Sequence, residues 1–293
     1  MGDSIVVSHV QEYSSNLQLL LQQKKSRLRQ AVMEGPHVGK NASPVDQLGA
    51  VEASDYDVRH PDTPNQDVPE DRRWVAPKGC HVGHMVDEED LVKVLTDIKS
   101  GYAQVDAAAI ARKVDRKILE AMFGTAKTGE DGTTSTTWAA FVAANPTHQI
   151  AAGGFGLTIP KLRAAKQALE TAEVDLDSDP IYCAIKAKQH AELLAEQQAI
   201  SMDYNEKPVL TEGKITYFLG IHFIHTELVQ TSGANNQVPV WAKSGMHLGV
   251  WKDAQGFAQL DPSKSFNWRV YARGIYGATR LEEKKLVECL VVA

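Results

Sequence analysis

The sequence predicts an α+β fold, arranged as two lobes or as one domain with large excursions. First, 293 residues exceed the length at which one hydrophobic core keeps growing. Second, a long helical pattern at 102–123 is followed by a second helix, a short buried strand and a third helix. Third, the last third of the chain is rich in β-forming residues. A hydrophobic content of 43% and a charged content of 23% are ordinary for a globular protein, so wholesale disorder is not expected.

Charge and cysteine content exclude several classes of protein. The net charge is -6, whereas tight binding of nucleic acid by a whole surface needs a basic stripe, so we expect loose contact at most. Cys80, Cys183 and Cys289 are too few for a disulfide framework and are expected to be free thiols in a reducing compartment. No apolar run approaches the ~18 residues of a membrane span. The N-terminus lacks the pattern of a secretory signal, which predicts a cytoplasmic product.

The first eighty residues are expected to form an arm and a long hairpin. Residues 8–33 combine leucines with a basic cluster and predict an arm with a helical stretch that lies along another surface. From Gly35 to Pro77 the sequence becomes rich in proline, with weak alternation of apolar residues. Because a structureless loop of this length is improbable in a compact domain, we predict a projecting two-stranded hairpin with its tip near 60–69. Isolated hairpins are marginal in water, so this one should lie on a partner.

The clearest helix of the chain is predicted from Tyr102 to Phe123, after a shorter helical pattern at 87–98. Gly124 supplies a stop, and the helix should be roughly 30 Å long. Its apolar stripe has one member every four residues: Ile110, Val114, Ile118 and Met122.

An α/β lobe is predicted next. Thr158 is a good N-cap and Pro160 suits the first turn of a helix. Residues 181–185 then read as a buried strand, and 186–198 as a helix. The stripe of the first helix is Leu162, Ala165, Leu169 and Ala172.

The C-terminal third is predicted to be mostly strand. Strands are expected at 216–228, 246–251, 266–271 and 286–292, with turns at 253–256 and 261–262. Thr279 and Glu282 have capping-box spacing, which predicts a helical turn after bends at Gly274 and Gly277. The last strand is apolar on both faces, so we expect it inside a sheet, close to the long helix.

Signals for a ligand site are weak. The stretch AAGGFGLT at 151–158 precedes a helix but lacks the Lys-Ser/Thr of a phosphate loop, so the glycines are expected only to turn the chain. Cys80, His81 and His84 lack a second pair of ligands at the spacing of a zinc site. His222 and His225 would point to opposite faces of a strand and cannot chelate together. We therefore expect no metal and no cofactor.

Signals for catalysis are also weak. The chain has no Gly-x-Ser-x-Gly elbow and no catalytic cysteine signature. The acidic run at 87–90 begins a helical pattern, where carboxylates favour the helix dipole. No catalytic residue is predicted.

The order of these parts resembles the major capsid proteins of tailed double-stranded-DNA bacteriophages, which share the Hong Kong 97 type of fold. The likeness covers about 48–292 and no single motif in it is catalytic. It is carried by DTPNQDVPEDRRWVAP at 62–77, MVDEEDLVKVLTDIKSGYAQVDAAAIARKVDRKILEAMFGTA at 85–126, EGKITYFLGIHFIHTEL at 212–228 and RVYARGIYGATRLEEKKLV at 269–287.

The resemblance implies a division of the chain into the parts of that fold. These would be an N-terminal arm (1–33), an extended loop (34–80), a peripheral domain with a spine helix (81–126), a mostly axial domain whose strands return to the peripheral domain (127–265) and C-terminal strands of the body (266–293).

The resemblance also implies a function. The subunit would self-assemble into hexamers and pentamers of an icosahedral phage head, enclosing double-stranded DNA without sequence-specific binding. It would reside in the virion and assemble in the host cytoplasm, with a portal and a scaffold or decoration protein as further partners. Only some thirty residues precede the loop, so a separate scaffold or none is expected. The alternatives are an encapsulin-like nanocompartment shell and a cytosolic α/β enzyme that uses the Gly153-Gly154 loop.

Residues at subunit boundaries are expected mainly among the arginines. Arg72 and Arg73 stand at the returning base of the loop, where they suit charge pairing with a neighbour. Some relatives join a lysine to an asparagine covalently, and Lys40 and Asn41 lie near the start of the loop, but no such bond is predicted. The expected interface residues are Arg72, Arg73, Trp74, Arg112, Arg116, Arg273 and Arg280.

Overall fold

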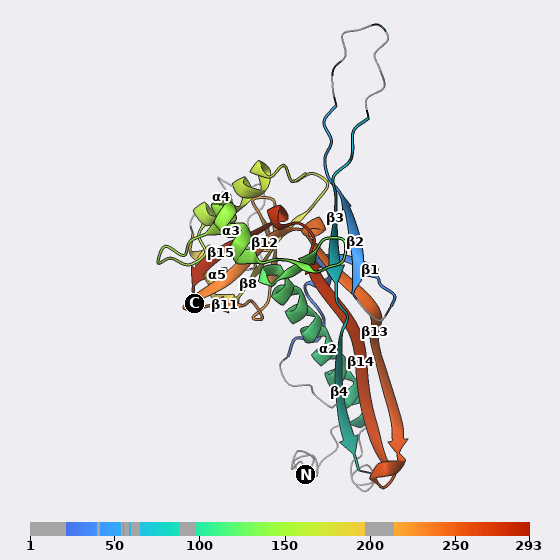
Figure 1. Cartoon of the computed structure of the whole chain (residues 1–293). Coiled ribbons are helices and arrows are strands. Elements are labelled where there is room, and N and C mark those ends of the chain that lie inside the picture. The colour runs from blue at the N-terminus through green and yellow to red at the C-terminus, as the bar shows by residue number, and fades with distance from the viewer. Residues whose placement is uncertain are drawn as a thin grey trace.

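The computed structural model describes residues 22–39, 42–53, 55, 59, 65–87, 98–196 and 214–293. Most of the short helix predicted at 87–98 lies outside these ranges. Lys40, Asn41 and most of the predicted arm lie outside them too. In the described part of the arm the chain forms one 3-10 turn, η2 (Arg29–Ala31). Figure 1 shows a rounded part, an elongated part built on one long helix, and a hairpin that projects where the two meet.

Among the described residues the strands form three sheets. The long sheet has the order β1 (Met33–Pro36), β13 (Met246–Asp261), β14 (Asn267–Arg280), β4 (Lys78–Val86). The central sheet has the order β7 (Gln149–Ile150), β15 (Leu286–Val292), β12 (Asn235–Ala242), β8 (Ile181–Ile185), β10 (Ile221–His225), β9 (Tyr217–Phe218), and β11 (Thr231–Ser232) pairs with β12. The hairpin sheet has the order β2 (Ser43–Leu48), β3 (Glu70–Val75), β5 (Ala126–Thr128), β6 (Thr134–Thr136).

The long helix is α2 (Ile98–Phe123), which starts four residues before the predicted position and ends immediately before Gly124, as predicted. Its four predicted stripe residues are each at most 3% exposed, because they pack on the face of the long sheet that carries Ala272 and Tyr276. Figure 1 shows α2 lying along β4, β13 and β14. The period of the apolar residues therefore identified this helix correctly.

The turn predicted at 253–256 is wrong, because β13 runs through it. The strand absorbs these residues with register shifts between Val250 and Gln255. The Asp253 carboxylate does not cap a turn. Instead it accepts hydrogen bonds from Arg29 and from the Tyr276 hydroxyl.

The bends predicted at Gly274 and Gly277 are also wrong, since both glycines lie inside β14. Glycine fits at these positions because neighbouring atoms leave no room for a side chain. A Cβ at Gly277 would stand 2.4 Å from the carbonyl oxygen of Ala76. Thr279 pairs with His247 in the long sheet, so it caps no helix. A single 3-10 turn, η7 (Glu283–Lys285), follows the strand.

The central sheet is covered on one face by α4 (Ile159–Thr171) and α5 (Ala187–Ala195). β8 and both helices lie where the sequence predicts them. The single strand predicted at 216–228 is instead an antiparallel pair, β9 and β10. The turn between them has positive φ at Leu219 (54°) and Gly220 (81°), a conformation that the β-rich composition of this stretch concealed. Two shorter helical elements, α3 (Trp138–Ala144) and η3 (Pro146–His148), complete this part.

The C-terminal strand β15 is an interior strand, but of the central sheet and not of the sheet that carries α2. It lies between β7 and β12. Val287, Cys289 and Val291 pack into the core beneath α4, whereas Leu286 joins the core that contains α2. Alternation along the strand predicted that both faces are covered, but it did not specify which layers cover them.

The hairpin is formed by β2 and β3, which pair antiparallel from Ser43–Val75 to Leu48–Glu70, within the segment where the sequence predicts a hairpin. The flanking strands β1 and β4 lie at the two opposite edges of the long sheet. The chain therefore leaves the long sheet at one edge, forms the hairpin, and returns at the other edge.

Candidate functional site: the arginine network at the hairpin base

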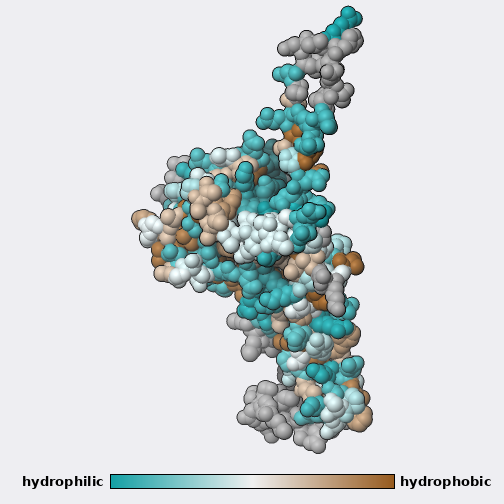
Figure 2. Space-filling model, viewed as in Figure 1, coloured by the Kyte–Doolittle hydropathy of each residue, from teal (hydrophilic) through white to brown (hydrophobic). Residues whose placement is uncertain are grey.

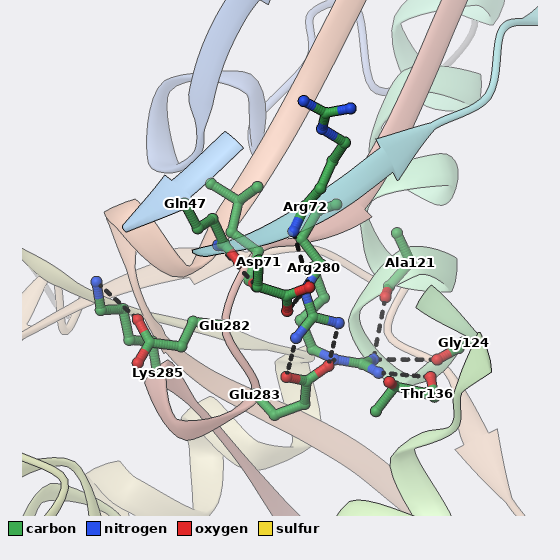
Figure 3. A network of polar contacts seen from close by, with 12 residues as sticks. Gln47, Asp71, Arg72, Ala121, Gly124, Thr136, Arg280, Glu282, Glu283 and Lys285 are labelled. Atoms are coloured by element: carbon green, nitrogen blue, oxygen red, sulfur yellow. Dashed lines mark hydrogen bonds and ion pairs between the residues drawn. The ribbon is translucent and has the colours of Figure 1, made fainter. Parts of the chain in front are cut away.

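Two buried arginines share one buried glutamate where the hairpin joins the body. Arg73 of β3 donates two hydrogen bonds to Glu283 of η7, Nη1 to Oε1 at 2.9 Å and Nη2 to Oε2 at 2.7 Å. Arg280 of β14 approaches the same carboxylate, with Nε 3.4 Å from Oε1. Figure 3 shows Arg280 and Glu283 facing each other beneath the hairpin strand that carries Asp71 and Arg72. This bidentate geometry is the strong form of an ion pair.

Arg280 also closes the C-terminal end of α2. Its Nη1 donates to the carbonyl oxygens of Met122 at 2.6 Å and Gly124 at 3.0 Å, and its Nη2 to that of Thr136 at 3.3 Å. The last carbonyls of a helix lack partners within the helix and carry partial negative charge, so a cation stabilises them. The guanidinium is fully buried and stacks 5.4 Å from the centre of the Trp138 ring. Burial lowers the pKa of Arg280, while the Glu283 carboxylate acts in the opposite direction.

Further contacts hold the hairpin to the body. Gln47 of β2 donates to the carbonyl of Leu281 at 3.0 Å, and the Trp74 indole donates to the carbonyl of Gly129 at 2.7 Å. Arg72 pairs with Asp46 across the hairpin at 2.5 Å. The base of the hairpin is therefore fixed by side chains from β2, β3, β14 and η7.

The predicted interface arginines differ in how deeply they are buried. Arg73 and Arg280 are buried, and their guanidinium groups are bonded within the subunit, so their observed role is to hold the fold. Arg112 is half-buried and donates to the side chain of Gln22 and the backbone of Gln23.

Arg72 and Trp74 are half-buried at the hairpin base, whereas Arg116 and Arg273 are exposed. Sequence reasoning missed Glu283, although its position three residues after Arg280 was an available signal. It also missed the aromatic neighbours of Arg273.

Those neighbours form an open patch on the long sheet. Side chains alternate along β14, so Ala272 and Tyr276 face α2 while Arg269, Tyr271 and Arg273 lie on the opposite face. Arg273 stands 5.4 Å from the centre of the Phe257 ring, and Arg269 stands 5.9 Å from that of Tyr271. We call this depression of about 520 Å³ the arginine face; its lining residues are His81, Phe257, Gln259, Arg269, Tyr271 and Arg273.

The glycine-rich stretch before α4 is a turn. Gly153 and Gly154 have positive φ, and the Lys161 ammonium donates to the carbonyls of Ala152 (2.8 Å), Phe155 (3.0 Å) and Leu290 (3.1 Å). These carbonyls surround a cation, which is the opposite of the N–H groups that cradle a phosphate.

Other candidate ligands do not converge. Cys80 and His81 are neighbours on β4 and so point to opposite faces. Within the described ranges no group of three His, Cys, Asp or Glu side chains could hold a metal ion. The three cysteines are free thiols, and burial raises the pKa of Cys289 to about 12. No described helix is both long and apolar enough to cross a membrane.

Known proteins resemble this chain over nearly its whole length. A family model described as "Phage capsid protein" matches residues 5–292. Among solved structures, the cyanophage Pam1 capsid gives a TM-score of 0.73 at 13% identity, covering 98% of this chain and 97% of that one. The capsid of cyanophage P-SCSP1u gives 0.72 at 12% identity, covering 97% and 93%. A chain of Mycobacterium phage Che8 gives 0.69 at 15% identity, covering 96% of each. No curated protein matches the sequence.

Proposed function

The chain belongs to the phage capsid protein family, and on this premise we propose that it builds the head of a tailed phage from hexamers and pentamers in an icosahedral shell around double-stranded DNA. It is a structural, non-enzymatic protein that assembles into a capsid, with the Hong Kong 97 type of fold. A portal and a scaffold or decoration protein complete the proposed set of partners, with assembly in the host cytoplasm. The family match favours neither the nanocompartment shell nor the cytosolic enzyme.

The proposed parts follow the resemblance, with one addition from the structure. Residues 1–33 are the arm, 34–80 the extended loop, 81–126 the peripheral domain with α2 as its spine, and 127–265 mostly the axial domain. The last part, 266–293, supplies β14 to the long sheet and β15 to the central sheet. It thus belongs to both domains.

The observation that carries the proposed assembly is the charge of the projecting hairpin. Its sequence between residues 52 and 71 has seven acidic residues and one arginine, so it is strongly negative: Glu52, Asp55, Asp57, Asp62, Asp67, Glu70 and Asp71, against Arg59. Such a segment has few apolar side chains to bury against its own subunit. Figure 2 shows the described part of the hairpin as mainly hydrophilic and standing clear of the body.

The arginine face offers a complementary surface. It carries Arg273 beside the exposed Phe257 ring, and Arg269, which pairs with Asp261 at 3.3 Å, beside the half-buried Tyr271 ring, on the face of the long sheet that α2 leaves open. Complementary charge steers association and sets the register between partners. We therefore place the acidic hairpin of one subunit on the arginine face of its neighbour.

Negative-stain electron microscopy of the expressed full chain tests this function. The wild type and a Lys264→Glu control, which changes an exposed lysine elsewhere on the surface, should both form closed shells. Arg273→Glu should give folded subunits that do not close into shells, because like charges then meet at the contact. Normal shells from Arg273→Glu would remove the arginine face from the proposal, and a wild type that forms neither shells nor hexamers and pentamers would contradict the function itself.

A further inference from the structure

A cleft of about 660 Å³ opens on the α2 side of the long sheet, between α2, the described part of the arm and β13. Its floor is formed by small and apolar side chains of α2, among them Ala107 and Ala111, which lie one helical turn apart. Four basic residues line it: Lys24, Lys25, Arg29 and Lys243. The arginine face lies on the other side of the same sheet.

The two acidic residues of the cleft are already bound. Arg29 donates to both Glu34 oxygens and to both Asp253 oxygens, the latter at 3.1 and 3.0 Å. The Tyr276 hydroxyl adds a hydrogen bond to Asp253 at 2.6 Å. These hydrogen bonds, Arg29 first, lower the pKa of Asp253 to about 2, so it stays ionised and paired.

The remaining charge of the cleft is positive. Lys24, Lys25 and Lys243 form no ion pair with any described residue. Two of them, Lys24 and Lys25, are exposed to solvent. On a chain whose net charge is -6, these lysines are a local excess of positive charge.

The lysine pair is held in place by a fixed turn of the arm. The fully buried Asp115 of α2 accepts hydrogen bonds from the Gln23 and Ser26 side chains and from the backbone N–H groups of Arg27 (3.0 Å) and Leu28 (3.2 Å). Leu28 itself is fully buried. The backbone that carries Lys24 and Lys25 is therefore preorganised against α2, which lowers the entropic cost of binding.

We propose that this lysine cleft contacts the phosphodiester backbone of the enclosed DNA. The inference rests on the proposed function, because it requires DNA inside the shell. Lysine ammonium groups act as point charges without the planar fork of arginine, and such contacts position a duplex without reading its sequence. Each subunit contributes only a few charges, so binding by the free subunit is weak at physiological salt. In a shell many subunits present this cleft to the same DNA, so their individually weak contacts combine into strong overall binding.

The salt dependence of DNA binding by the full-length subunit tests the cleft. Affinity for a short duplex is measured by fluorescence anisotropy over a range of low salt concentrations. Each phosphate that a lysine no longer neutralises reduces the slope of log K against log salt by about 0.9. Lys24→Gln with Lys25→Gln should therefore reduce the slope by roughly 2. Lys24→Arg with Lys25→Arg should keep it, because the charge remains.

A matched control separates the cleft from overall charge. Lys264→Gln with Lys284→Gln removes two exposed lysines elsewhere and changes the net charge equally, and it should leave the slope unchanged. An equal reduction in this control, or an unchanged slope in the cleft variant, would overturn the proposal. The proposal would also be overturned if polyglutamate bound more tightly than DNA and this binding depended on Lys24 and Lys25. The cleft would then be a site for an acidic protein. Microscopy of every variant distinguishes the outcomes. If shells form but the slope of the cleft variant is unchanged, the cleft alone is rejected. A wild type that forms neither shells nor hexamers and pentamers rejects the proposed function.

Discussion

Glu283 is the residue on which two buried positive charges depend. It receives two hydrogen bonds from Arg73 and lies 3.4 Å from Arg280. A buried ion pair adds little net stability when intact, but removing one partner leaves an uncompensated charge in a region of low dielectric. This carboxylate therefore compensates two buried guanidinium groups, and the half-exposed Asp71, 3.8 Å from Arg73, is a second and weaker partner of one of them.

Replacing Glu283 with Gln should destabilise the subunit by about 3–5 kcal/mol, because both guanidinium groups lose their nearest counter-charge. Chemical denaturation of the unassembled subunit measures this loss. Glu282→Gln is the control: its side chain is partly exposed and pairs with Lys285 at 3.1 Å, so its effect should stay within about 0.5 kcal/mol. Equal midpoints for the two variants would show that the network does not stabilise the fold.

A second residue-scale prediction concerns the histidine pair that joins β1 to β13. His37 Nε2 and His247 Nε2 are 2.7 Å apart, so one ring donates and the other accepts, and at most one can be charged. Burial, reinforced by His37, lowers the pKa of His247 to about 4, and burial lowers that of His37. In the unfolded chain both rings bind protons near pH 6.5.

The unfolded state therefore binds more protons than the folded state below that pH, and stability should fall as the pH drops from about 6.5 towards 4. Denaturation midpoints across this window measure the loss. His247→Gln should flatten the curve, whereas changing the exposed His81 to Gln should not. A wild-type midpoint that stays constant across the window would contradict the assignment.

At the scale of elements, β15 carries more of the core than its length suggests. It is an interior strand of the central sheet, and Leu286, Val287, Cys289 and Val291 are fully buried. Its one acidic side chain, Glu288, is buried too and accepts hydrogen bonds from Trp138, Gln149 and Gln237. The strand thus ties α3, β7 and β12 together.

Truncation before Leu286 should give insoluble or protease-sensitive protein and not merely unassembled protein. Each fully buried apolar side chain contributes roughly 1.5–3 kcal/mol, and the sum rivals the ~5–15 kcal/mol stability of a typical domain. Limited proteolysis and circular dichroism of the truncated chain check this. A folded monomer would show that the strand serves a contact between subunits.

Local patterns predicted elements well where one signal dominated. The four-residue stripe of α2 and the apolar run of β8 needed no knowledge of distant residues. The C-terminal half of the chain was harder, because Asp253 and Gly277 are turn-formers by composition but serve tertiary contacts: Asp253 binds Arg29, and Gly277 admits the backbone of Ala76. Arg73 and Arg280 were predicted to lie at subunit boundaries, whereas their burial within the subunit depends on residues distant in the chain: Glu283 for Arg73, and Met122 for Arg280.

At the scale of the whole molecule, the long sheet presents two unlike surfaces. One face carries α2 and the lysine cleft, and the other carries the arginine face. In the proposed shell, the first surface faces the DNA and the second receives the hairpin of a neighbour. A single sheet thus separates two different sets of charged contacts.

Assembly should slow as salt is added, because the contact between the acidic hairpin and the arginine face is electrostatic. Exposed charges are screened beyond about 10 Å at 0.1 M salt. Light scattering during assembly at rising ionic strength measures the effect. Arg273→Gln should assemble more slowly than the wild type at low salt and should depend less on salt, while Lys264→Gln should follow the wild type. Rates independent of salt would favour an apolar contact.

The short connection 281–285 is held in place by side chains from several elements. It links β14 of the long sheet to β15 of the central sheet, and Glu283 within it is clamped by Arg73 from the hairpin and Arg280 at the end of α2. Leu281 is buried and held through its carbonyl by Gln47. These three side chains fix the connection relative to the hairpin and to the long sheet. The base of the hairpin, the end of the long helix, the long sheet and the central sheet are therefore joined at one point, so we expect a neighbour that pushes on the hairpin base to move all four together.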